Sequence, residues 1–470
     1  MSHNQPPSLI FYLVSSPFPN WRMKVAFVAS EAFPFAKVGG LADVVGSLPQ
    51  ALKKQGLEPT IFLPWYWGIP GYYVGETWFN FEGRREKIGI GHAEHEGVRY
   101  VLVGLGDFAR DKPYGYPDDF RRFVRFALAT ALLLGDFDIV HAHDWQAALL
   151  PLLRNLDCFQ ARTVYTIHNL AYQGVWGSQD FYAWTGLPGE TYYGAGLEHH
   201  GSVNLMKAGI VNADAVTTVS PRYAWEITTP EGGFGLDGVL RAQQWKLRGI
   251  LNGLDTHYWN PATDPYLQYH YDASDLSGKA QNRALLLTEL ALEDRPTLGV
   301  VARFAQQKGI DLIADAVDDL MDLGINLVVL GSGDPNLERT FTWMAAHLKG
   351  RLAYVQGYHE ALAHRIYAGS DGFLMPSRFE PCGLAQLIAM RYGTPPIVRA
   401  VGGLLDTVKH WETGFMFDTA DVGGILHGVR EFLKHPERES VARKAMQQDF
   451  SWEKPAREYL ALYRQLLGVA

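Results

Sequence analysis

The sequence predicts an α/β protein built from two doubly wound parallel-sheet domains. The chain has 470 residues, which is too long for one hydrophobic core of ordinary size. Short runs rich in Val and Ile recur along it, and each is followed by a helical pattern. Runs that are apolar throughout, rather than alternating with polar residues, are typical of strands buried on both faces.

These runs fall into two series, one in each half of the chain. The strands expected in the first half span residues 25–29, 60–63, 139–142, 163–167 and 215–219. The strands expected in the second half span residues 298–301, 326–330, 351–355, 372–375 and 396–398. Strands that alternate with helices indicate βαβ units, so two series indicate two domains, joined near residues 252–263.

The remaining segments are less regular. Residues 65–120 are richer in Gly, Tyr and Phe, which favours antiparallel strands and loops. From Met23 the chain reads MKVAFVASEAFPF, as expected for a first buried strand. We therefore interpret residues 1–22 as an N-terminal extension that the fold does not need, and we expect it to be disordered. Residues 452–470 are predicted to form a C-terminal helix that returns to the first domain.

Composition excludes several classes of protein. With 42 Lys and Arg against 50 Asp and Glu, the net charge is −8, which argues against a dedicated nucleic-acid binder. No apolar run reaches the length of a membrane span, and residues 8–19 lack the flanks of a signal peptide. The two cysteines, Cys158 and Cys382, rule out a disulfide framework. These features favour a cytoplasmic protein.

One motif occurs once in each half of the chain. Residues 38–45 read VGGLADVV and residues 401–408 read VGGLLDTV. Paired glycines let a ligand approach the backbone, and the helix that follows offers free N–H groups to an anion. The motif therefore favours a loop that faces a phosphate or a sugar, the alternative being two unrelated glycine turns.

Several common functional motifs are incomplete or absent in this sequence. The turn at residues 331–333 has Asn336 where a dinucleotide-binding loop needs glycine, and no P-loop or G-x-S-x-G motif is present. His359 and His364 are five residues apart, which does not place them on one helical face. His141 and His143 form either a metal-binding pair or, as we favour, packed and hydrogen-bonded side chains.

Charged residues follow predicted strands, where ligands bind in open parallel sheets. Arg303 and Lys308 come after one strand, and two fixed cations there can hold a diphosphate. Glu380 precedes a predicted helix, where a carboxylate can balance positive charge on an anomeric carbon. Solvated surface charges and a helix-capping acid are the respective alternatives. Two facing domains would bring Lys37 and His168 into the same cleft.

Seven segments carry a family resemblance. They are KVGGLADVVGSLP (37–49), HAHDWQ (141–146), TIHNLAYQG (166–174), NGLD (252–255), RFAQQKG (303–309), GY (357–358) and EPCGLAQLIAMRYGTPP (380–396). Together these segments resemble the family of bacterial glycogen synthases and plant starch synthases, retaining glucosyltransferases of the GT-B fold. They occur in the family's order across almost the whole chain from Met23.

The resemblance implies transfer of glucose from ADP-glucose to the non-reducing end of an α-1,4-glucan such as glycogen, with release of ADP and retention of configuration. It implies no metal or other cofactor and no nucleic-acid or membrane partner, and it leaves the oligomeric state open. Residues 23–250 would form the Rossmann-like domain on the acceptor side. Residues 251–451 would form the Rossmann-like domain that binds the nucleotide sugar.

The resemblance also implies residue roles. Arg303 and Lys308 would bind the donor diphosphate, Glu380 would support the glucosyl group in its oxocarbenium-like transition state, and His168 and Lys37 would complete the catalytic set. The implied donor-binding residues are Gly39, Gly40, Asp43, Asn252, Tyr358 (stacking on adenine), Cys382, Gly383, and the backbone amides of Gly402, Gly403 and Leu404. The implied acceptor-side residues are Asp144, Trp145 and Asn169.

Two positions bear on specificity. Related GT-B loops carry a second Glu eight residues after the first, whereas this chain has Ile388, which fits the glycogen-synthase pattern. Val401 replaces a usual Thr. Cys382 is interpreted as a small packed residue and not a nucleophile.

Two alternative functions remain. They are a transferase that uses UDP-glucose or another acceptor, and a non-catalytic glucan-binding relative. A phosphorylase lacks its pyridoxal-phosphate lysine context here.

Overall fold

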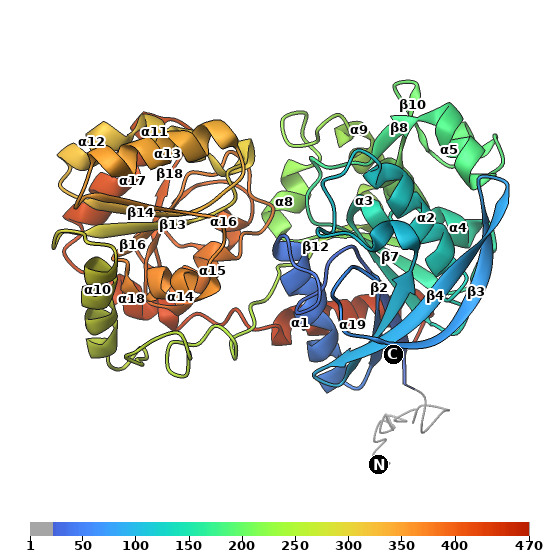
Figure 1. Ribbon diagram of the computed structural model, residues 1–470, viewed down its shortest axis with the longest axis horizontal. Coiled ribbons are helices and arrows are strands. Elements are labelled where there is room, and N and C mark those ends of the chain that lie inside the picture. The colour runs from blue at the N-terminus through green and yellow to red at the C-terminus, as the bar shows by residue number, and fades with distance from the viewer. Residues whose placement is uncertain (1–21, 470) are drawn as a thin grey trace, which may run out of the picture.

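The computed structural model describes residues 22–469, and within them the chain forms two α/β lobes side by side (Figure 1). The N-terminal lobe, coloured blue to green, lies on the right of Figure 1, and the C-terminal lobe, coloured yellow to red, lies on the left. The predicted extension, residues 1–22, lies outside the described residues except for Arg22.

The N-terminal lobe is built on a nine-stranded sheet in the order β12-β11-β7-β6-β1-β2-β5-β4-β3. All pairs are parallel except those that β4 makes with β5 and β3, so the expected antiparallel segment is confirmed. The strands are β1 (Lys24–Val28), β2 (Glu58–Pro64), β3 (Tyr72–Phe81), β4 (Arg84–His95), β5 (Val98–Gly104), β6 (Ile139–His143), β7 (Arg162–Ile167), β11 (Ala215–Thr218) and β12 (Leu247–Gly249).

The C-terminal lobe is built on a six-stranded, wholly parallel sheet in the order β15-β14-β13-β16-β17-β18. Its strands are β13 (Thr297–Val301), β14 (Asn326–Gly331), β15 (Leu352–Gln356), β16 (Gly372–Met375), β17 (Pro396–Arg399) and β18 (Phe415–Phe417). Every predicted strand is present in the two sheets. The edge strands β12 and β18 were not predicted, because three residues are too few to show a hydrophobic pattern.

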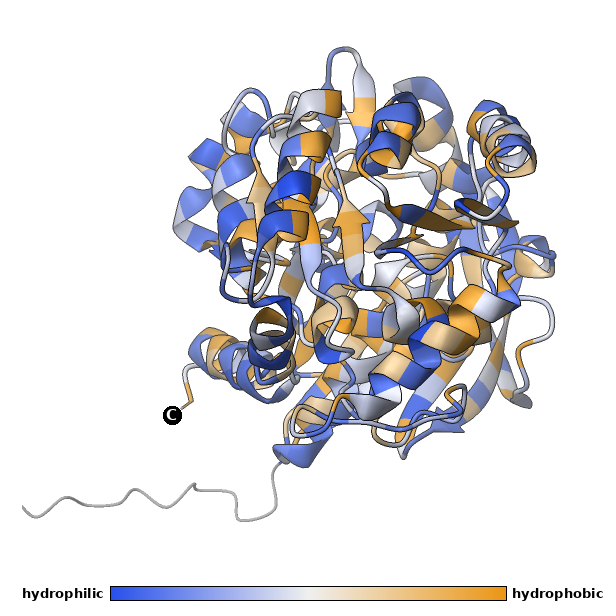
Figure 2. Cartoon of the chain, turned by 90° about the vertical axis from the view of Figure 1, so that its left-hand side faces the viewer, coloured by the Kyte–Doolittle hydropathy of each residue, from blue (hydrophilic) through white to orange (hydrophobic). Residues whose placement is uncertain are grey.

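Helices cover both faces of each sheet. Figure 2 shows strands that are largely hydrophobic, and helices whose residues alternate between hydrophilic and hydrophobic. The helices of the N-terminal lobe are α1 (Gly40–Lys54), α2 (Asp119–Ala131), α3 (Asp144–Ala147), α4 (Leu150–Asn155), α5 (Ser178–Thr185), α6 (Thr191–Gly194), α7 (Leu205–Asn212), α8 (Pro221–Glu226) and α9 (Asp237–Ala242). A small sheet accompanies them, formed by β8 (Val175–Gly177), β9 (Glu198–His199) and β10 (Ser202–Asn204).

The later helices begin after the segment that leads into the C-terminal lobe. They are α10 (Ser277–Glu289), α11 (Ile310–Asp315), α12 (Val317–Asp322), α13 (Pro335–His347), α14 (Glu360–Gly369), α15 (Ala385–Arg391), α16 (Gly403–Thr407), α17 (Val422–Lys434), α18 (Arg438–Met446) and α19 (Glu453–Leu467). No helix within residues 22–469 is both long and apolar enough to cross a membrane.

Helix starts follow local chemistry. The Asp334 side chain accepts hydrogen bonds from the Asn336 and Leu337 amides, and Pro335 occupies the first turn of α13. A side-chain cap of this kind satisfies amides that have no partner inside the helix. Ser220 caps α8 in the same way, by accepting from the Tyr223 amide, and so fixes α8 beside the junction of the lobes.

The helix α19 returns to the N-terminal lobe and packs beside α1 (Figure 1). Its buried Tyr463 hydroxyl lies 2.7 Å from His141 Nδ1 on β6. The crossing begins at Trp452, whose ring packs on Gly253 in the segment that runs the other way between the lobes. The two interlobe segments are therefore packed against each other.

We predict that Gly253→Ala destabilises the protein, because an added Cβ would lie 2.7 Å from the Trp452 ring. Overpacking of this kind costs about 1–3 kcal/mol of unfolding free energy. A thermal melt should show a lower midpoint for Gly253→Ala. Gly106→Ala is the control, since a Cβ at that position meets nothing within 4 Å, and an equal midpoint for the two variants would contradict the packing argument.

Candidate active site

The carboxyl ends of the parallel strands in both lobes point toward one region, where loops from the two lobes meet. Asn169 follows β7, and its Nδ2 donates to Gln307 Oε1 of the C-terminal lobe at 3.1 Å. Ser220 follows β11, and its Oγ donates to the Pro381 carbonyl at 2.6 Å. These bonds join the loops that carry the predicted site residues, including Asn169 itself.

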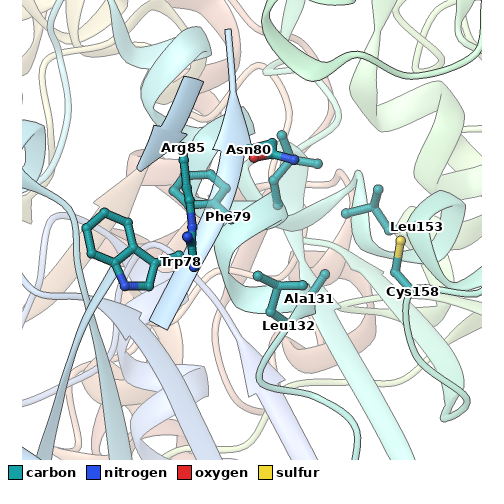
Figure 3. Close-up of a pocket in the computed structure, with 9 residues that line it drawn as sticks. Trp78, Phe79, Asn80, Arg85, Ala131, Leu132, Leu153 and Cys158 are labelled. Atoms are coloured by element: carbon teal, nitrogen blue, oxygen red, sulfur yellow. The ribbon is translucent and has the colours of Figure 1, made fainter. Parts of the chain in front are cut away.

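The cavity drawn in Figure 3 lies away from these loops. This cavity of about 400 Å³ opens on the N-terminal lobe. It is lined by Trp78, Phe79, Asn80, Arg85, Leu128, Ala131, Leu132, Leu153 and Cys158. None of the predicted site residues is among them, so the candidate site is identified by its charged groups and loop positions rather than by cavity volume.

Lys308 and Glu380 form an ion pair at the centre of the site. The Lys308 Nζ lies 2.6 Å from Glu380 Oε2, and Ser377 Oγ donates to the same oxygen at 3.0 Å. Glu380 is only 3% exposed. A buried carboxylate is tolerated when a charge and hydrogen bonds compensate its desolvation. The fold thus brings together two residues that the sequence places in separate loops.

The loop that carries Lys308 is shaped by Gly309, which has a φ of 65°. A Cβ at this position would collide with the Pro376 carbonyl, in the loop that follows β16. Glycine is therefore required both for the backbone conformation and for the close approach of the two loops. The approach in turn sets the Lys308–Glu380 distance.

Glu31 and Tyr114 were not predicted from the sequence. The buried Glu31 carboxylate accepts hydrogen bonds from the amides of Val38 (2.6 Å) and Gly39 (2.7 Å), and from the Tyr114 hydroxyl. Burial raises the pKa of Glu31, while these bonds and the nearby charge of Arg303 oppose the rise. Glu31 therefore holds the first glycine-rich loop. An acid just after a buried strand was the available signal.

Lys37 and Asp43 pair with each other at the start of α1. The Lys37 Nζ lies 2.8 Å from Asp43 Oδ1. Burial raises the pKa of Asp43, the Lys37 ammonium opposes this, and the acids Glu360 and Asp255 add to the rise. Asp43 therefore neutralises Lys37 in this structure, and the pair sits where acids of the C-terminal lobe approach.

Asp144 holds the loop that carries His168, while its expected contact with the acceptor stays a prediction. Its Oδ1 accepts from the amides of His168 at 2.7 Å and Asn169 at 3.3 Å. Burial raises the pKa of the Asp144 carboxyl to about 7. Trp145 likewise packs inside the lobe, stacked on Phe120 with ring centroids 6.2 Å apart. Both side chains therefore support the loops of the site through contacts within the N-terminal lobe.

The amides of the second glycine-rich loop bond protein acceptors, and their expected contact with the phosphates stays a prediction. The amide of Gly402 donates to Glu226 Oε1 of α8 at 2.9 Å, and that of Gly403 donates to the Glu380 carbonyl at 2.9 Å. The Leu404 amide donates within its own turn, at 3.1 Å. The three amides predicted to bind phosphate are therefore already used by protein acceptors. The loop supports Glu380 and joins the lobes, as the position of α8 in Figure 1 shows.

The first glycine-rich loop makes a similar use of its glycines. The amide of Gly39 is held by Glu31, and Gly40 faces Leu384 of the C-terminal lobe, 3.4 Å from where its Cβ would lie. The two copies of the motif therefore share a role in positioning loops at the junction.

Other predicted donor residues lie in the same region with mixed exposure. Cys382 is buried, and burial raises the pKa of its thiol to about 12, so the interpretation of a packed residue is confirmed. Gly383 adopts a φ of 76° and leads into α15. Asn252 is buried, whereas Tyr358 stands 56% exposed after β15, available for stacking.

The two neighbouring histidines of β6 use three of their four ring nitrogens in hydrogen bonds. His141 bonds Tyr463 through Nδ1 at 2.7 Å and Thr166 through Nε2 at 2.5 Å. His143 Nδ1 lies 2.9 Å from His168 Nε2. The rings are packed and hydrogen-bonded, which was the favoured interpretation, and one of them touches a predicted catalytic residue.

Comparison with known families covers most of the chain. Residues 24–242 match the family described as Starch synthase catalytic domain. Residues 287–449 match the family described as Glycosyl transferases group 1.

Relatives match over nearly their whole length. A glycogen synthase of Thermus thermophilus is 49% identical over 446 residues, covering 95% of this chain and 100% of the relative. A glycogen synthase of Deinococcus radiodurans is 46% identical, covering 94% of this chain and 100% of the relative.

Solved structures of related enzymes have a similar fold. The catalytic domain of starch synthase IV from Arabidopsis thaliana, bound to ADP and acarbose, matches with a TM-score of 0.89 and 36% identity, covering 95% of this chain and 100% of that chain. A sucrose-phosphate synthase from Thermosynechococcus elongatus, covering the same shares, matches with a TM-score of 0.65 at 20% identity, which supports the fold alone. The chain therefore belongs to the glycogen and starch synthase family of glycosyltransferases with the GT-B fold.

Proposed function

We propose that this protein is a glycogen synthase that transfers glucose from ADP-glucose to the non-reducing end of an α-1,4-glucan, with retention of configuration and release of ADP. The Lys308–Glu380 ion pair is the observation that carries the proposal, because it places a cation and a carboxylate together in the loops where the lobes meet. Relatives named glycogen synthase at 49% and 46% identity, and a neighbour bound to ADP and acarbose, support the choice of substrates.

The charges fit the demands of this reaction. As the bond to the nucleotide breaks, negative charge grows on the diphosphate and positive charge grows on the anomeric carbon. Lys308 and Arg303 would stabilise the leaving diphosphate, since fixed cations aimed at developing charge lower a barrier most effectively in a site that excludes water. Glu380, held by Lys308 and Ser377, would face the glucosyl group without moving.

His168 would act as a neutral group beside the transferred sugar. Burial lowers the pKa of its imidazole to about 3, so the ring is uncharged near neutral pH. A neutral ring can donate or accept a hydrogen bond to a sugar hydroxyl but cannot compete with Arg303 and Lys308 for the diphosphate. The positive charge in the site then belongs to the donor side.

The remaining substrate assignments extend this proposal. We expect Tyr358 to stack on the adenine, and we expect activity without any metal ion, because the two fixed cations supply the charge that a metal would otherwise supply. UDP-glucose as donor and a purely glucan-binding role are the alternatives. A cytoplasmic location stays a prediction.

The first prediction from the proposed function concerns the donor. Glucose incorporation into glycogen should be strongly favoured with ADP-glucose over UDP-glucose, and a chelator such as EDTA should leave the rate unchanged. Preference for UDP-glucose would overturn the donor assignment while keeping the chemistry. No incorporation from either donor, with ADP still bound, would favour the glucan-binding alternative.

The second prediction concerns Glu380. Glu380→Gln removes the charge that balances the anomeric carbon, so kcat should fall by about 10²–10³-fold, the scale seen when one preorganised stabilising group is lost. ADP affinity, measured by calorimetry, should change far less. The control is Glu439→Gln on α18, whose exposed side chain pairs only with Arg443 one helical turn away, and which should keep wild-type kcat. Equal losses of turnover and ADP affinity in Glu380→Gln would show a binding role only.

The third prediction concerns closure of the lobes. If the donor contacts both lobes, ADP should favour a closed form that excludes water and so protects the glucosyl group from hydrolysis. Small-angle scattering should show a smaller radius of gyration with saturating ADP than without it. An unchanged radius at saturation would contradict closure.

A further inference from the structure

His168 has a buried partner that the proposed reaction does not use. His143 ends β6, and the parallel neighbour β7 pairs His143 with Thr166, two residues before His168. This register places His143 Nδ1 2.9 Å from His168 Nε2. The contact is between two ring nitrogens, so one must donate its proton and the other must accept.

Both rings are neutral, which leaves two arrangements of the protons. Burial lowers the pKa of His143 well below its usual value, and it lowers the pKa of His168 as well. In the first arrangement His143 Nδ1–H donates to His168 Nε2. In the second, His168 Nε2–H donates to His143 Nδ1, and the proton of His143 must then be on its own Nε2.

The surroundings of His143 distinguish the two arrangements. His143 Nε2 is buried and has no hydrogen-bond partner among the described residues. The second arrangement would leave an N–H group buried without an acceptor, whereas the first leaves only an unpaired lone pair. Unmatched buried donors are rarer than under-used acceptors and cost their full desolvation. The first arrangement is therefore the stable one.

Packing holds the His143 ring in this orientation. The ring stacks on His141, with centroids 4.2 Å apart, and lies parallel to Phe27 at 5.8 Å. A flip of the ring would put a carbon where Nδ1 now meets His168 and would lose the bond. The ring of His141 is in turn held by Tyr463 and Thr166.

The consequence concerns the other side of His168. His168 Nδ1 has no hydrogen-bond partner among residues 22–469 and is not among their fully buried unpartnered atoms, so it keeps some solvent exposure. We propose that His143 is a positioning residue that holds His168 as the Nδ1–H tautomer, so that His168 presents a hydrogen-bond donor, and not an acceptor, to a hydroxyl of the transferred glucosyl group. This inference rests on the proposed function for the identity of the sugar. The choice of tautomer does not depend on it.

The tautomer is measured directly, without turnover. The probe is the unliganded full-length enzyme with ¹⁵N-labelled histidine, and two-bond nitrogen–proton correlation spectra report which ring nitrogen is protonated. The His168 signal is the one that disappears in His168→Gln. We expect Nδ1–H for His168 and Nδ1–H for His143. A wild-type His168 signal of the Nε2–H form would overturn the proposal whether or not the enzyme is active on glucan.

Kinetics test whether this positioning matters for catalysis. His143→Leu keeps an apolar side chain in the stack but removes the donor, so kcat should fall about 10-fold, the scale of one hydrogen bond, with KM for ADP-glucose nearly unchanged. His143→Asn, whose amide nitrogen stands near the position of Nδ1, should recover most of the loss. Unchanged kcat in a folded His143→Leu would overturn the positioning role.

The matched control is Tyr463→Phe, which breaks a hydrogen bond in the same buried cluster without touching His168. It should lower the thermal midpoint and change kcat far less than His143→Leu does, because Thr166 still bonds His141 Nε2. An equal loss of kcat in Tyr463→Phe would assign the effect to packing of the cluster and not to the His143–His168 bond. An inactive wild-type enzyme with the expected tautomer would instead count against the proposed function.

Discussion

The ion pair between Lys308 and Glu380 is the interaction on which the arrangement of the site depends. Two charges in a nearly buried position are costly unless each has its partner and the remaining lone pairs are used. Ser377 supplies one of those bonds, and the glycine-rich loop at residues 402–403 holds the backbone of Glu380 from behind. The presence of this ion pair is better explained by a role in the reaction than by a contribution to the free energy of unfolding. Two apolar side chains of similar size would stabilise the fold as much.

Close approach of backbones is the second constraint. Gly309 lets the Lys308 loop lie against the loop after β16, and Gly402 adopts a φ of 49° while it lies against the Glu380 carbonyl. At both places a side chain would collide with a carbonyl group of the neighbouring loop. The glycines therefore set the distances between the loops. These in turn set the distance between Lys308 Nζ and Glu380 Oε2.

Buried polar groups also support the loops on the N-terminal side of the site. Glu31 holds the first glycine-rich loop, and Asp144 holds the loop of His168, each by accepting backbone N–H bonds. Neutral imidazoles extend this support from β6 toward α19. The site thus combines the Lys308–Glu380 ion pair of the C-terminal lobe with loops of the N-terminal lobe that buried acids hold in place.

The pattern of apolar and charged residues along the sequence predicted much of the fold and part of the site. Continuous apolar runs located ten strands of the two sheets, because burial on both faces of a parallel sheet favours apolar residues throughout a strand. The long strands β3, β4 and β5 were expected only as an antiparallel segment within residues 65–120. Charged residues after strands, such as Arg303 and Lys308, were found because parallel strands bring their carboxyl ends to one edge. The three-residue edge strands β12 and β18 were too short to show a hydrophobic pattern.

Only the tertiary structure decided which polar groups form hydrogen bonds with each other. Gly402 donates to Glu226, 176 residues away, and Tyr114 bonds Glu31, 83 residues away. Whether an amide is open to a ligand or already bonded depends on such distant partners, because a hydrogen bond is fixed by position in space and not by order along the chain.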